Sequence, residues 1–255
     1  MIAALAALLS LPSFAQGTDN ELESSFGGRA SVGADWKISK GFHLSGEAEF
    51  RAYDSSMESA RASLALSYKL NPWLKASAGY VFIDKNKKDG STTIRHRIYG
   101  DLTGSLKAGD WRFSLRERLL MTHKDVGNHY QTTPNLVELK SRFKVSWKGL
   151  SHVTPYALFE LRTVLNDPAL SATWSGSEYS DYQFLGYKDS YINRYRGGLG
   201  VEWKLDKHNS LDFYGLMDYC RDKDIDTDSA GETLKSLTYD RKLRGIIGVG
   251  YVYSF

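Results

Sequence analysis

Apolar and polar residues alternate with a period of two along most of this chain. Between residues 30 and 38 the even positions hold Ala, Val, Ala, Trp and Ile, and the odd positions between them hold polar residues or glycine. The alternation recurs in about eleven segments of roughly ten to fifteen residues each. Successive side chains of a strand point to opposite faces, so the pattern predicts an all-β protein.

The connections between these segments differ in length in a regular way. Short connections lie at 39–41, 71–72, 108–110, 149–153 and 206–209. Long polar connections lie at 84–93, 123–137, 166–190 and 221–239. Tight turns at one end and long loops at the other are typical of transmembrane up-and-down β-barrels. We therefore expect one antiparallel barrel domain over residues 16–255, with short periplasmic turns and long outer loops.

The direction of the segments bears on the number of strands. Single-chain bacterial barrels usually have an even number of strands, and the first and last alternating segments run the same way. We therefore expect one more strand at residues 17–26 and about twelve strands in all, with ten as the fallback. The segment that starts at Trp111 puts Glu117 in its apolar register, and a β-bulge, which swaps the faces of a strand, is expected there.

The first residues of the chain resemble an export signal. An apolar run over residues 2–11 is broken by Pro12, and small residues follow as far as Ala15. The run is too short to span a membrane as a helix, which takes about 20 residues. The pattern predicts a secretory signal peptide over residues 1–15, cleaved before Gln16.

The last strand carries a second signal. One of its faces presents Tyr251, Tyr253 and the terminal Phe255. This aromatic end resembles the closing strand of bacterial outer-membrane barrels, where it is the assembly signal. The resemblance implies location in the bacterial outer membrane, with outer-membrane lipid and the barrel assembly machinery as partners.

Composition excludes several classes of protein. The mean hydropathy of −0.41 and the lack of a long apolar stretch after residue 15 exclude a helical membrane protein, but not a barrel, in which only every second side chain faces lipid. The 16 Tyr among 13% aromatic residues suit aromatic belts at the membrane interfaces. Cys220 is the only cysteine, which leaves no internal disulfide. A net charge of +3 is too small to indicate nucleic acid as a partner, and no cofactor motif is present.

If the apolar face meets lipid, the polar face lines the lumen, and that face is strongly basic. It includes Arg29 and Lys140. The candidate anion-binding residues on this face are Arg51, Arg61, Arg95, Arg97, Arg112, Arg116, Arg118, Arg142, Arg162, Arg194, Arg196 and Arg244. The candidate acid partners are Glu47, Glu49, Glu160, Glu202 and Asp218. Pairs two residues apart, such as Arg95 and Arg97, share a face of the strand.

Two interpretations of this lumen remain open. In one, arginines and carboxylates pair and close the interior of a structural or surface-interaction barrel. In the other, the surplus of cations makes a narrow, anion-preferring channel or solute-binding barrel. Because arginine binds carboxylate and phosphate through two parallel hydrogen bonds, small anionic solutes such as acidic sugars or phosphorylated compounds would suit it.

An enzymatic role is a weaker hypothesis. His96 is the one histidine in the lipid-facing register, and Ser141 lies in the same register of another strand. They could form a lipid-acting His–Ser site only if the fold brings them together, and we expect a barrel that is not an enzyme. His123 and His129 share one outer loop, but their spacing is weak evidence for a metal site. The aromatic residues of 166–190 either stack on sugar rings or pack over the barrel mouth.

Several strand sequences are similar to a known family. The segment Trp-Lys-Ile-Ser-Lys-Gly-Phe-His-Leu-Ser-Gly-Glu-Ala-Glu-Phe-Arg at 36–51 resembles the opening hairpin of domain of unknown function 2490, common in Bacteroidetes-type bacteria. The segments at 94–97, 111–118 and 193–203 resemble later strands of the same family. The resemblance covers nearly the whole chain after residue 15 and implies an outer-membrane barrel. It implies no catalytic residues.

Overall fold

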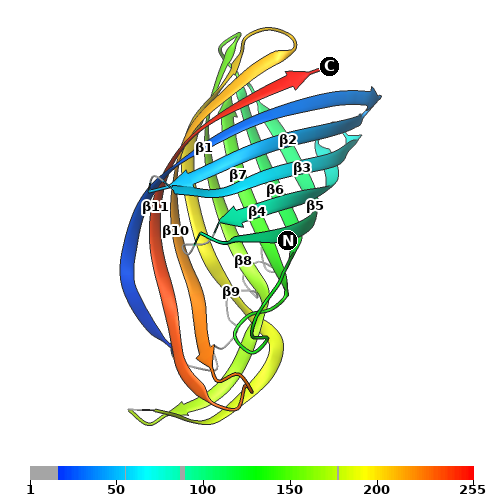
Figure 1. Cartoon of the computed structure of the whole chain (residues 1–255). Helices are drawn as coiled ribbons and strands as arrows, with labels where there is room; N and C mark the ends of the chain where they lie inside the picture. The colour runs from blue at the N-terminus through cyan, green and yellow to red at the C-terminus, as the bar shows by residue number, and fades with distance from the viewer. Residues whose placement is uncertain (1–16, 55, 87–89, 177) are drawn as a thin grey trace.

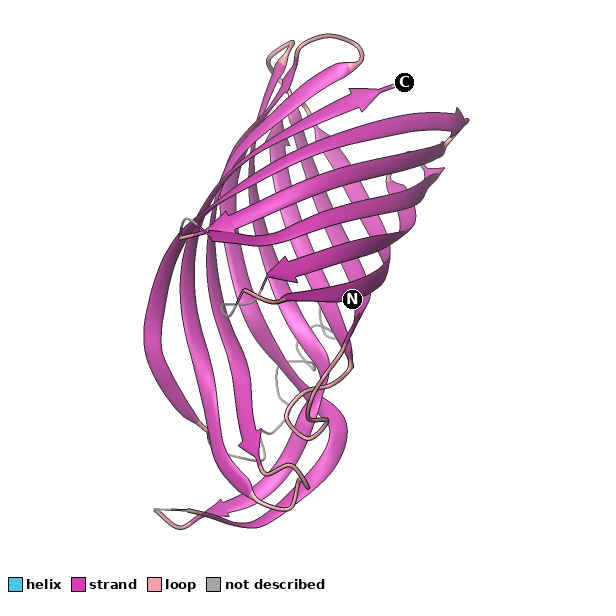
Figure 2. Cartoon of the chain, viewed as in Figure 1, coloured by secondary structure: helices cyan, strands magenta, loops and turns pink. Residues whose placement is uncertain are grey.

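The structure is a computed structural model that describes residues 17–54, 56–86, 90–176 and 178–255. The expected signal peptide over residues 1–15 lies outside the described residues. The described chain consists of strands joined by turns and loops (Figures 1 and 2), and no described helix is long and apolar enough to cross a membrane. The all-β prediction is confirmed.

The described residues form eleven strands, which close into one barrel. Their bounds are β1 Thr18–Ser39, β2 Phe42–Tyr53, β3 Ser56–Asn71, β4 Leu74–Asn86, β5 Thr92–Ala108, β6 Trp111–Lys124, β7 Asn135–Trp147, β8 Val153–Trp174, β9 Tyr179–Lys204, β10 Asn209–Thr227 and β11 Leu234–Ser254. Strands that follow one another along the chain pair antiparallel, as expected of an up-and-down barrel.

The barrel closes through a parallel pair between β1 and β11. An odd number of strands makes this necessary, because the first and last strands then run the same way. Residues 18–26, where a separate strand was expected, instead lengthen β1 and pair with the start of β11, with Thr18 opposite Thr238. The count of eleven lies between the expected twelve and the fallback of ten.

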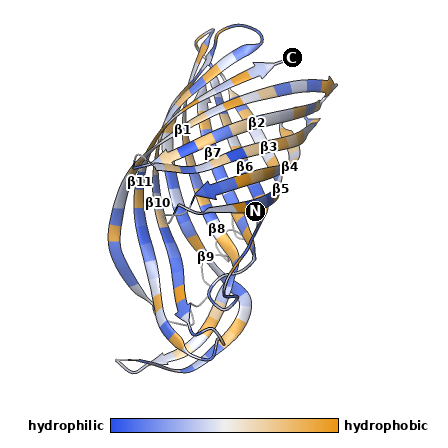
Figure 3. Cartoon of the chain, in the orientation of Figure 1, coloured by the Kyte–Doolittle hydropathy of each residue, from blue (hydrophilic) through white to orange (hydrophobic). Residues whose placement is uncertain are grey.

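The two faces of the wall differ as the alternation predicts. Large apolar side chains such as Leu64, Leu199 and Ile247 are more than half exposed on the outside. The arginines of the opposite register line cavities inside the barrel. Figure 3 shows hydrophobic and hydrophilic positions alternating along the strands. The inside of this barrel is therefore polar and its outside apolar.

The wall is taller on one side than on the other. Strands β8 to β11 have 22, 26, 19 and 21 residues, whereas β2, β4 and β7 have 12 or 13. The residues expected to form long loops at 166–190 and 221–239 are mostly strand and project beyond the barrel at the bottom of Figure 1. The expectation of two long loops there is wrong, because these residues continue the ladders of β8 with β9 and of β10 with β11.

The projecting ends of β8, β9, β10 and β11, which we call the cap, carry a small apolar core of their own. Leu170, Ile225, Leu234 and Leu237 form this core, all at most 5% exposed. In the β10–β11 connection the backbone N–H groups of Thr233 and Glu232 donate to the Asp228 carboxylate and hold its pKa below its ordinary value. The cap is therefore an ordered extension of the wall.

Strand β6 is regular where a bulge was expected. It pairs with β5 and with β7 without any shift of register, with Glu117 opposite Leu102 on one side and Ser141 on the other. Glu117 consequently keeps the outward register of Leu115 and Leu119. The prediction of a bulge is wrong, because the carboxylate is accommodated on the outer face by a hydrogen bond from the Ser141 hydroxyl, 2.6 Å away.

Candidate functional site

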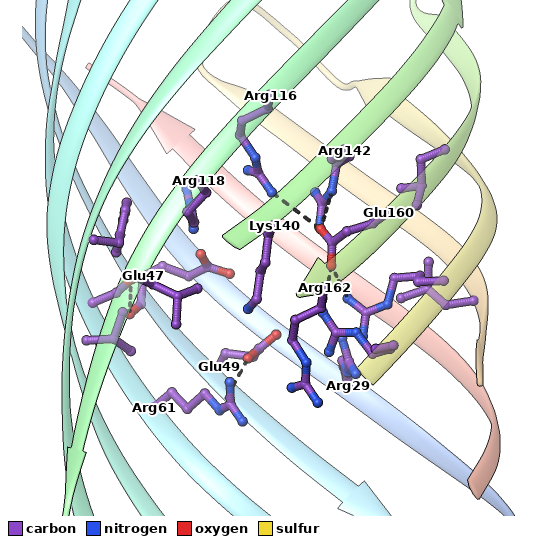
Figure 4. A pocket seen from close by; sticks show the side chains of 18 of the residues that line it. Arg29, Glu47, Glu49, Arg61, Arg116, Arg118, Lys140, Arg142, Glu160 and Arg162 are labelled. Atoms are coloured by element: carbon purple, nitrogen blue, oxygen red, sulfur yellow. Dashed lines mark hydrogen bonds and ion pairs between the residues drawn. The ribbon is translucent and has the colours of Figure 1, made fainter. Parts of the chain in front are cut away.

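The candidate site is a cavity of about 430 Å³ at the centre of the lumen, shown in Figure 4. Residues from ten of the strands line it, and their charges are unequal: eleven are arginine or lysine and four are glutamate or aspartate. The alternation of the strands causes this arrangement, because the inward register of most strands carries arginine or lysine. The cavity is therefore a basic chamber enclosed by the barrel wall.

Two further cavities flank the central one. The first, of about 350 Å³, includes Ser45, Lys75 and Lys144 and lies toward the short turns. The second, of about 330 Å³, includes Lys85, Lys124 and Lys223 and lies toward the cap. Both share lining residues with the central cavity. The three cavities thus follow one another along the lumen.

Of the twelve arginines predicted from the sequence, eleven line the central cavity or the cavity toward the cap, and Arg112 is the exception. The central cavity is lined by Arg51, Arg61, Arg97, Arg116, Arg118, Arg142, Arg162, Arg194 and Arg196. Arg95 and Arg244 line the cavity toward the cap. Arg112 lines none of the three, because it is the second residue of β6, close to the turn. Of the predicted acids, Glu47, Glu49 and Glu160 line the central cavity and Asp218 the one toward the cap.

Glu160 is the centre of the ion pairs in this chamber. Its side chain is 1% exposed, and its carboxylate oxygens lie 2.6 Å from Arg142 and 2.7 Å from Arg194. Arg196 and Arg116 approach to 3.6 and 3.7 Å. Figure 4 shows Arg116 and Arg142 pointing toward it. One carboxylate from β8 therefore faces four arginines from β6, β7 and β9.

Other acids of the lumen form local pairs, whereas Asp212 of the cavity accepts a hydrogen bond from the Tyr156 hydroxyl at 2.9 Å. Arg196 donates two hydrogen bonds of 2.6 Å to Asp218, a two-point contact. Elsewhere Arg118 pairs with Asp101, Arg51 with Glu49 at 2.6 Å, and Lys144 with Glu202 at 2.6 Å. Each of these carboxylates neutralises one neighbouring cation or part of one. The acids are too few to neutralise the chamber as a whole.

Several cations in the chamber lack an acid partner. The Lys140 side chain makes no ion pair or hydrogen bond with any residue that the structure describes, although Glu138 and Glu160 lie near enough to attract its charge. Arg97 donates to the Thr122 hydroxyl at 2.8 Å and Arg29 to the Tyr53 hydroxyl at 2.9 Å, so their partners are neutral. A positive charge without a counterion is costly away from bulk water. These three side chains are therefore prepared to receive anionic groups.

Tyrosines also line the lumen, and the sequence reasoning missed them. Tyr99, Tyr156 and Tyr214 face the central cavity, and the Arg118 guanidinium lies 3.9 Å from the centre of the Tyr99 ring. The composition alone predicts outer belts for the aromatic residues. The alternation itself indicates the inward position, because each of the three tyrosines stands at one of the polar positions of its strand. Tyr156, for example, lies between Pro155 and Ala157.

Each of these three tyrosines covers a glycine on an adjacent strand. Tyr99 pairs with Gly79, Tyr156 with Gly200 and Tyr214 with Gly248. A Cβ atom added to these glycines would lie 2.5, 2.4 and 2.1 Å from the tyrosine rings. Only glycine leaves room for the ring to lie against the wall, as in the aromatic rescue of strand glycines. The tyrosines therefore lean along the wall and leave the centre of the lumen to the charged groups.

The residues considered for catalysis lie apart. His96 on β5 is opposite His123 on β6, and its Nδ1 is 2.6 Å from the Tyr80 hydroxyl. Ser141 on β7 is opposite Glu117, six positions from His123 along β6. The fold consequently does not form a His96–Ser141 pair. Among the described ranges of the chain, no group of three or more His, Cys, Asp or Glu side chains could hold a metal ion.

The aromatic residues of the closing strand gather at the turn end. The rings of Trp36 and Phe255 stack with centroids 5.1 Å apart, and Tyr253 contacts Phe255 edge-on at 4.7 Å. The Tyr251 hydroxyl bonds Asn209. The backbone N–H of Phe255 donates to Asp35 and so continues the pairing of β11 with β1. The chain end is thus part of the wall at the β1–β11 seam.

Closed topology, an apolar outer face and a basic interior define this protein as a β-barrel with a charged lumen. The chain belongs to the family described as protein of unknown function (DUF2490), whose pattern matches residues 30–228. The matched range runs from within β1 to the end of β10, and so includes most of the lumen. No curated protein matches the chain.

Proposed function

We propose that this protein is a bacterial outer-membrane barrel with its apolar outer face in lipid. The exposed apolar side chains support this, because a water-soluble protein rarely leaves such a continuous apolar surface uncovered. Paired aromatic residues at the turn end, Trp111 with Trp147 and Trp36 with Phe255, suit a membrane interface. We orient the barrel as outer-membrane barrels usually are, with the short turns in the periplasm and the cap outside the cell.

Within that barrel we propose a narrow, anion-preferring conduit or solute-binding lumen. The observation that carries the proposal is the central cavity, where eleven cationic side chains face four carboxylates. A ring of positive charge in a narrow lumen attracts anions and repels cations. Arginines with free donor groups favour phosphate and carboxylate, so small phosphorylated or acidic sugar solutes are the proposed cargo.

Planar-bilayer recordings of the purified protein test this function. Under a KCl gradient we expect a reversal potential that reports preference for chloride. Arg97→Gln removes a cation whose hydrogen-bond partner, Thr122, is neutral and should lower the chloride preference, by roughly twofold or more if it lies in the conducting path. Lys40→Gln, in the exposed β1–β2 turn, is the matched control and should leave it unchanged. No conductance, or preference for potassium, would contradict the proposal.

A closed lumen is the second candidate, and the Glu160 group favours it. Four arginines from three strands meet one carboxylate there, which cross-links the interior as a structural core would. A barrel of this kind would present its cap to partners outside the cell and conduct nothing. Bilayers that stay silent while the protein is inserted and folded would favour this candidate over the conduit.

We also propose that the barrel is not an enzyme. The separation of His96 from Ser141 removes the pair on which a lipid-acting site would depend. The test is the lipid profile of vesicles that contain the folded protein. Hydrolysis of phospholipid or lipid A that is lost in His96→Ala would contradict the proposal.

A further inference from the structure

Two cavities of the lumen meet at a set of arginines. The central cavity, of about 430 Å³, and the cavity toward the cap, of about 330 Å³, have six lining residues in common among those that the structure describes, and all six are arginine. We call this set the arginine ring: Arg29, Arg51, Arg61, Arg97, Arg162 and Arg194. They come from β1, β2, β3, β5, β8 and β9. A solute at the junction of the two cavities therefore meets guanidinium groups on most sides.

The pairing of the strands brings these cations into direct opposition. Arg29 on β1 lies opposite Arg51 on β2. Arg162 on β8 lies opposite Arg194 on β9. Arg51 also lies near enough to Arg97 for their charges to repel. Like charges directly opposite one another destabilise a sheet, and the repulsion is stronger away from bulk water. Negative charge placed within the ring would therefore stabilise the barrel.

Carboxylates of the wall neutralise only part of the ring. Three of its arginines have a carboxylate oxygen within 3.1 Å, namely Arg51 with Glu49, Arg162 with Glu138 and Arg194 with Glu160. Arg61 reaches Glu49 only at 3.9 Å. Arg29 and Arg97 make no ion pair with a described residue, and their hydrogen bonds go to neutral hydroxyl groups. The arginines of β1, β3 and β5 are thus the open part of the ring.

Several donor groups of the ring are left without an acceptor. Arg29 and Arg194 are 7% and 8% exposed, and the buried Nε atom of each has no hydrogen-bond partner among the described residues. Arg97 uses its Nε for Thr122, and its terminal nitrogens contact no described acceptor. Lys140, close to Arg97, reaches into the chamber in Figure 4. Buried donors without acceptors are costly, so this arrangement favours an anionic ligand.

We infer that the arginine ring binds one phosphate group, carried by a small phosphorylated solute or present as inorganic phosphate. Such a group has about two negative charges and three acceptor oxygens that point in different directions, so it can accept hydrogen bonds from β1, β3 and β5 together. A carboxylate has one charge and its oxygens lie in one plane. Guanidinium groups also bind phosphate through two parallel hydrogen bonds. The inference rests on the proposed solute-binding lumen and narrows its cargo to phosphate.

Equilibrium dialysis of the purified barrel in detergent micelles against radiolabelled inorganic phosphate tests the site. We expect saturable binding of one phosphate per chain when the buffer keeps phosphate as the dianion. Sulfate, a second tetrahedral dianion, should compete for the site, and acetate at the same concentration should not. Absence of saturable binding, or equal competition by acetate, would overturn the inference.

A substitution that keeps the charge separates a built site from general attraction. Arg97→Lys retains the positive charge but loses the two-point guanidinium contact, so it should weaken phosphate binding roughly tenfold. Arg112→Lys is the matched control, because Arg112 lines none of the three cavities, and its phosphate binding should equal that of the unmodified protein. If the two variants bind phosphate equally well, the ring is not the site.

The phosphate site and the conduit can fail separately. A barrel that prefers chloride in planar bilayers but retains no phosphate in dialysis overturns the site and leaves the conduit standing. A barrel that binds phosphate in a manner that depends on Arg97, yet conducts nothing, supports the site and overturns the conduit.

Discussion

At the scale of single residues, the lumen combines one highly shared carboxylate with several cations that share none. Glu160 contacts four arginines, whereas Arg29, Arg97 and Lys140 make no direct ion pair with a described residue. The two arrangements have opposite effects on the positive charge of the lumen. The shared carboxylate keeps like charges from forcing the wall apart, and the lone cations keep a positive potential in the cavity.

The first prediction concerns the shared carboxylate. Glu160→Gln leaves Arg142 and Arg194 without their counterion and should destabilise the folded barrel by about 3–5 kcal/mol, the usual cost of breaking a buried ion pair. Urea unfolding in lipid vesicles, followed by tryptophan fluorescence, measures it. Glu202→Gln is the matched control, because its side chain is 38% exposed and solvent screens the loss. Equal effects of the two variants would show that Glu160 has no special part in stability.

The sequence predicted which way these residues point but not which of them pair. The period of two assigns Arg142, Glu160 and Arg194 to the inside. Their contact depends on the stagger between β7, β8 and β9, which the pattern does not encode. The partner of Lys144, Glu202, comes from a strand two places away around the barrel. Such choices follow from the curvature of the closed wall.

At the scale of strands, inward tyrosines and the glycines beneath them act as fitted pairs. The second prediction is that Gly248→Ala destabilises the barrel by about 1–3 kcal/mol, because the new methyl group would lie 2.1 Å from the Tyr214 ring. Gly215→Ala is the control, since Gly215 faces open space on the outer face of β10. Both are measured by the midpoint of urea unfolding.

A double-mutant cycle separates this fit from a general intolerance of alanine. In the Tyr214→Ala background the added methyl group has no ring to displace, so Gly248→Ala should cost little. If the cost is the same in both backgrounds, the tyrosine is not its cause.

The strands themselves were largely predictable, and their outer ends were not. Alternation located the body of each strand. It failed at residues 166–190, where Pro168, Gly186 and many polar residues resemble a loop. The fold nevertheless extends β8 and β9 there, because the apolar core of Leu170, Ile225, Leu234 and Leu237 stabilises the extension. That core joins segments more than 50 residues apart, which a local pattern cannot anticipate.

At the scale of the whole molecule, the lumen concentrates charge that the composition conceals. A net charge of +3 spread over 255 residues is unremarkable, yet eleven cations line the central cavity. The closed wall separates this charge from the apolar exterior. The electrostatic character of the barrel is therefore set by topology as much as by composition.

The third prediction follows from that separation. If the basic lumen selects anions by its potential, the chloride preference should fall steeply as KCl rises from 0.01 to 1 M, because the screening length shrinks from about 30 to about 3 Å. Reversal potentials at fixed tenfold gradients measure it. A preference that is independent of salt would indicate selection by size or by direct binding.

The barrel has ten antiparallel joints and one parallel joint, between β1 and β11. Parallel ladders are slightly weaker per residue, but this one pairs sixteen residues of β1 with β11, whereas the β7–β8 ladder pairs nine. Until β1 and β11 pair, the sheet is open and both of its edge strands are unpaired. Closure of the barrel therefore depends on a long ladder between the first and last strands, which must meet before either edge is covered.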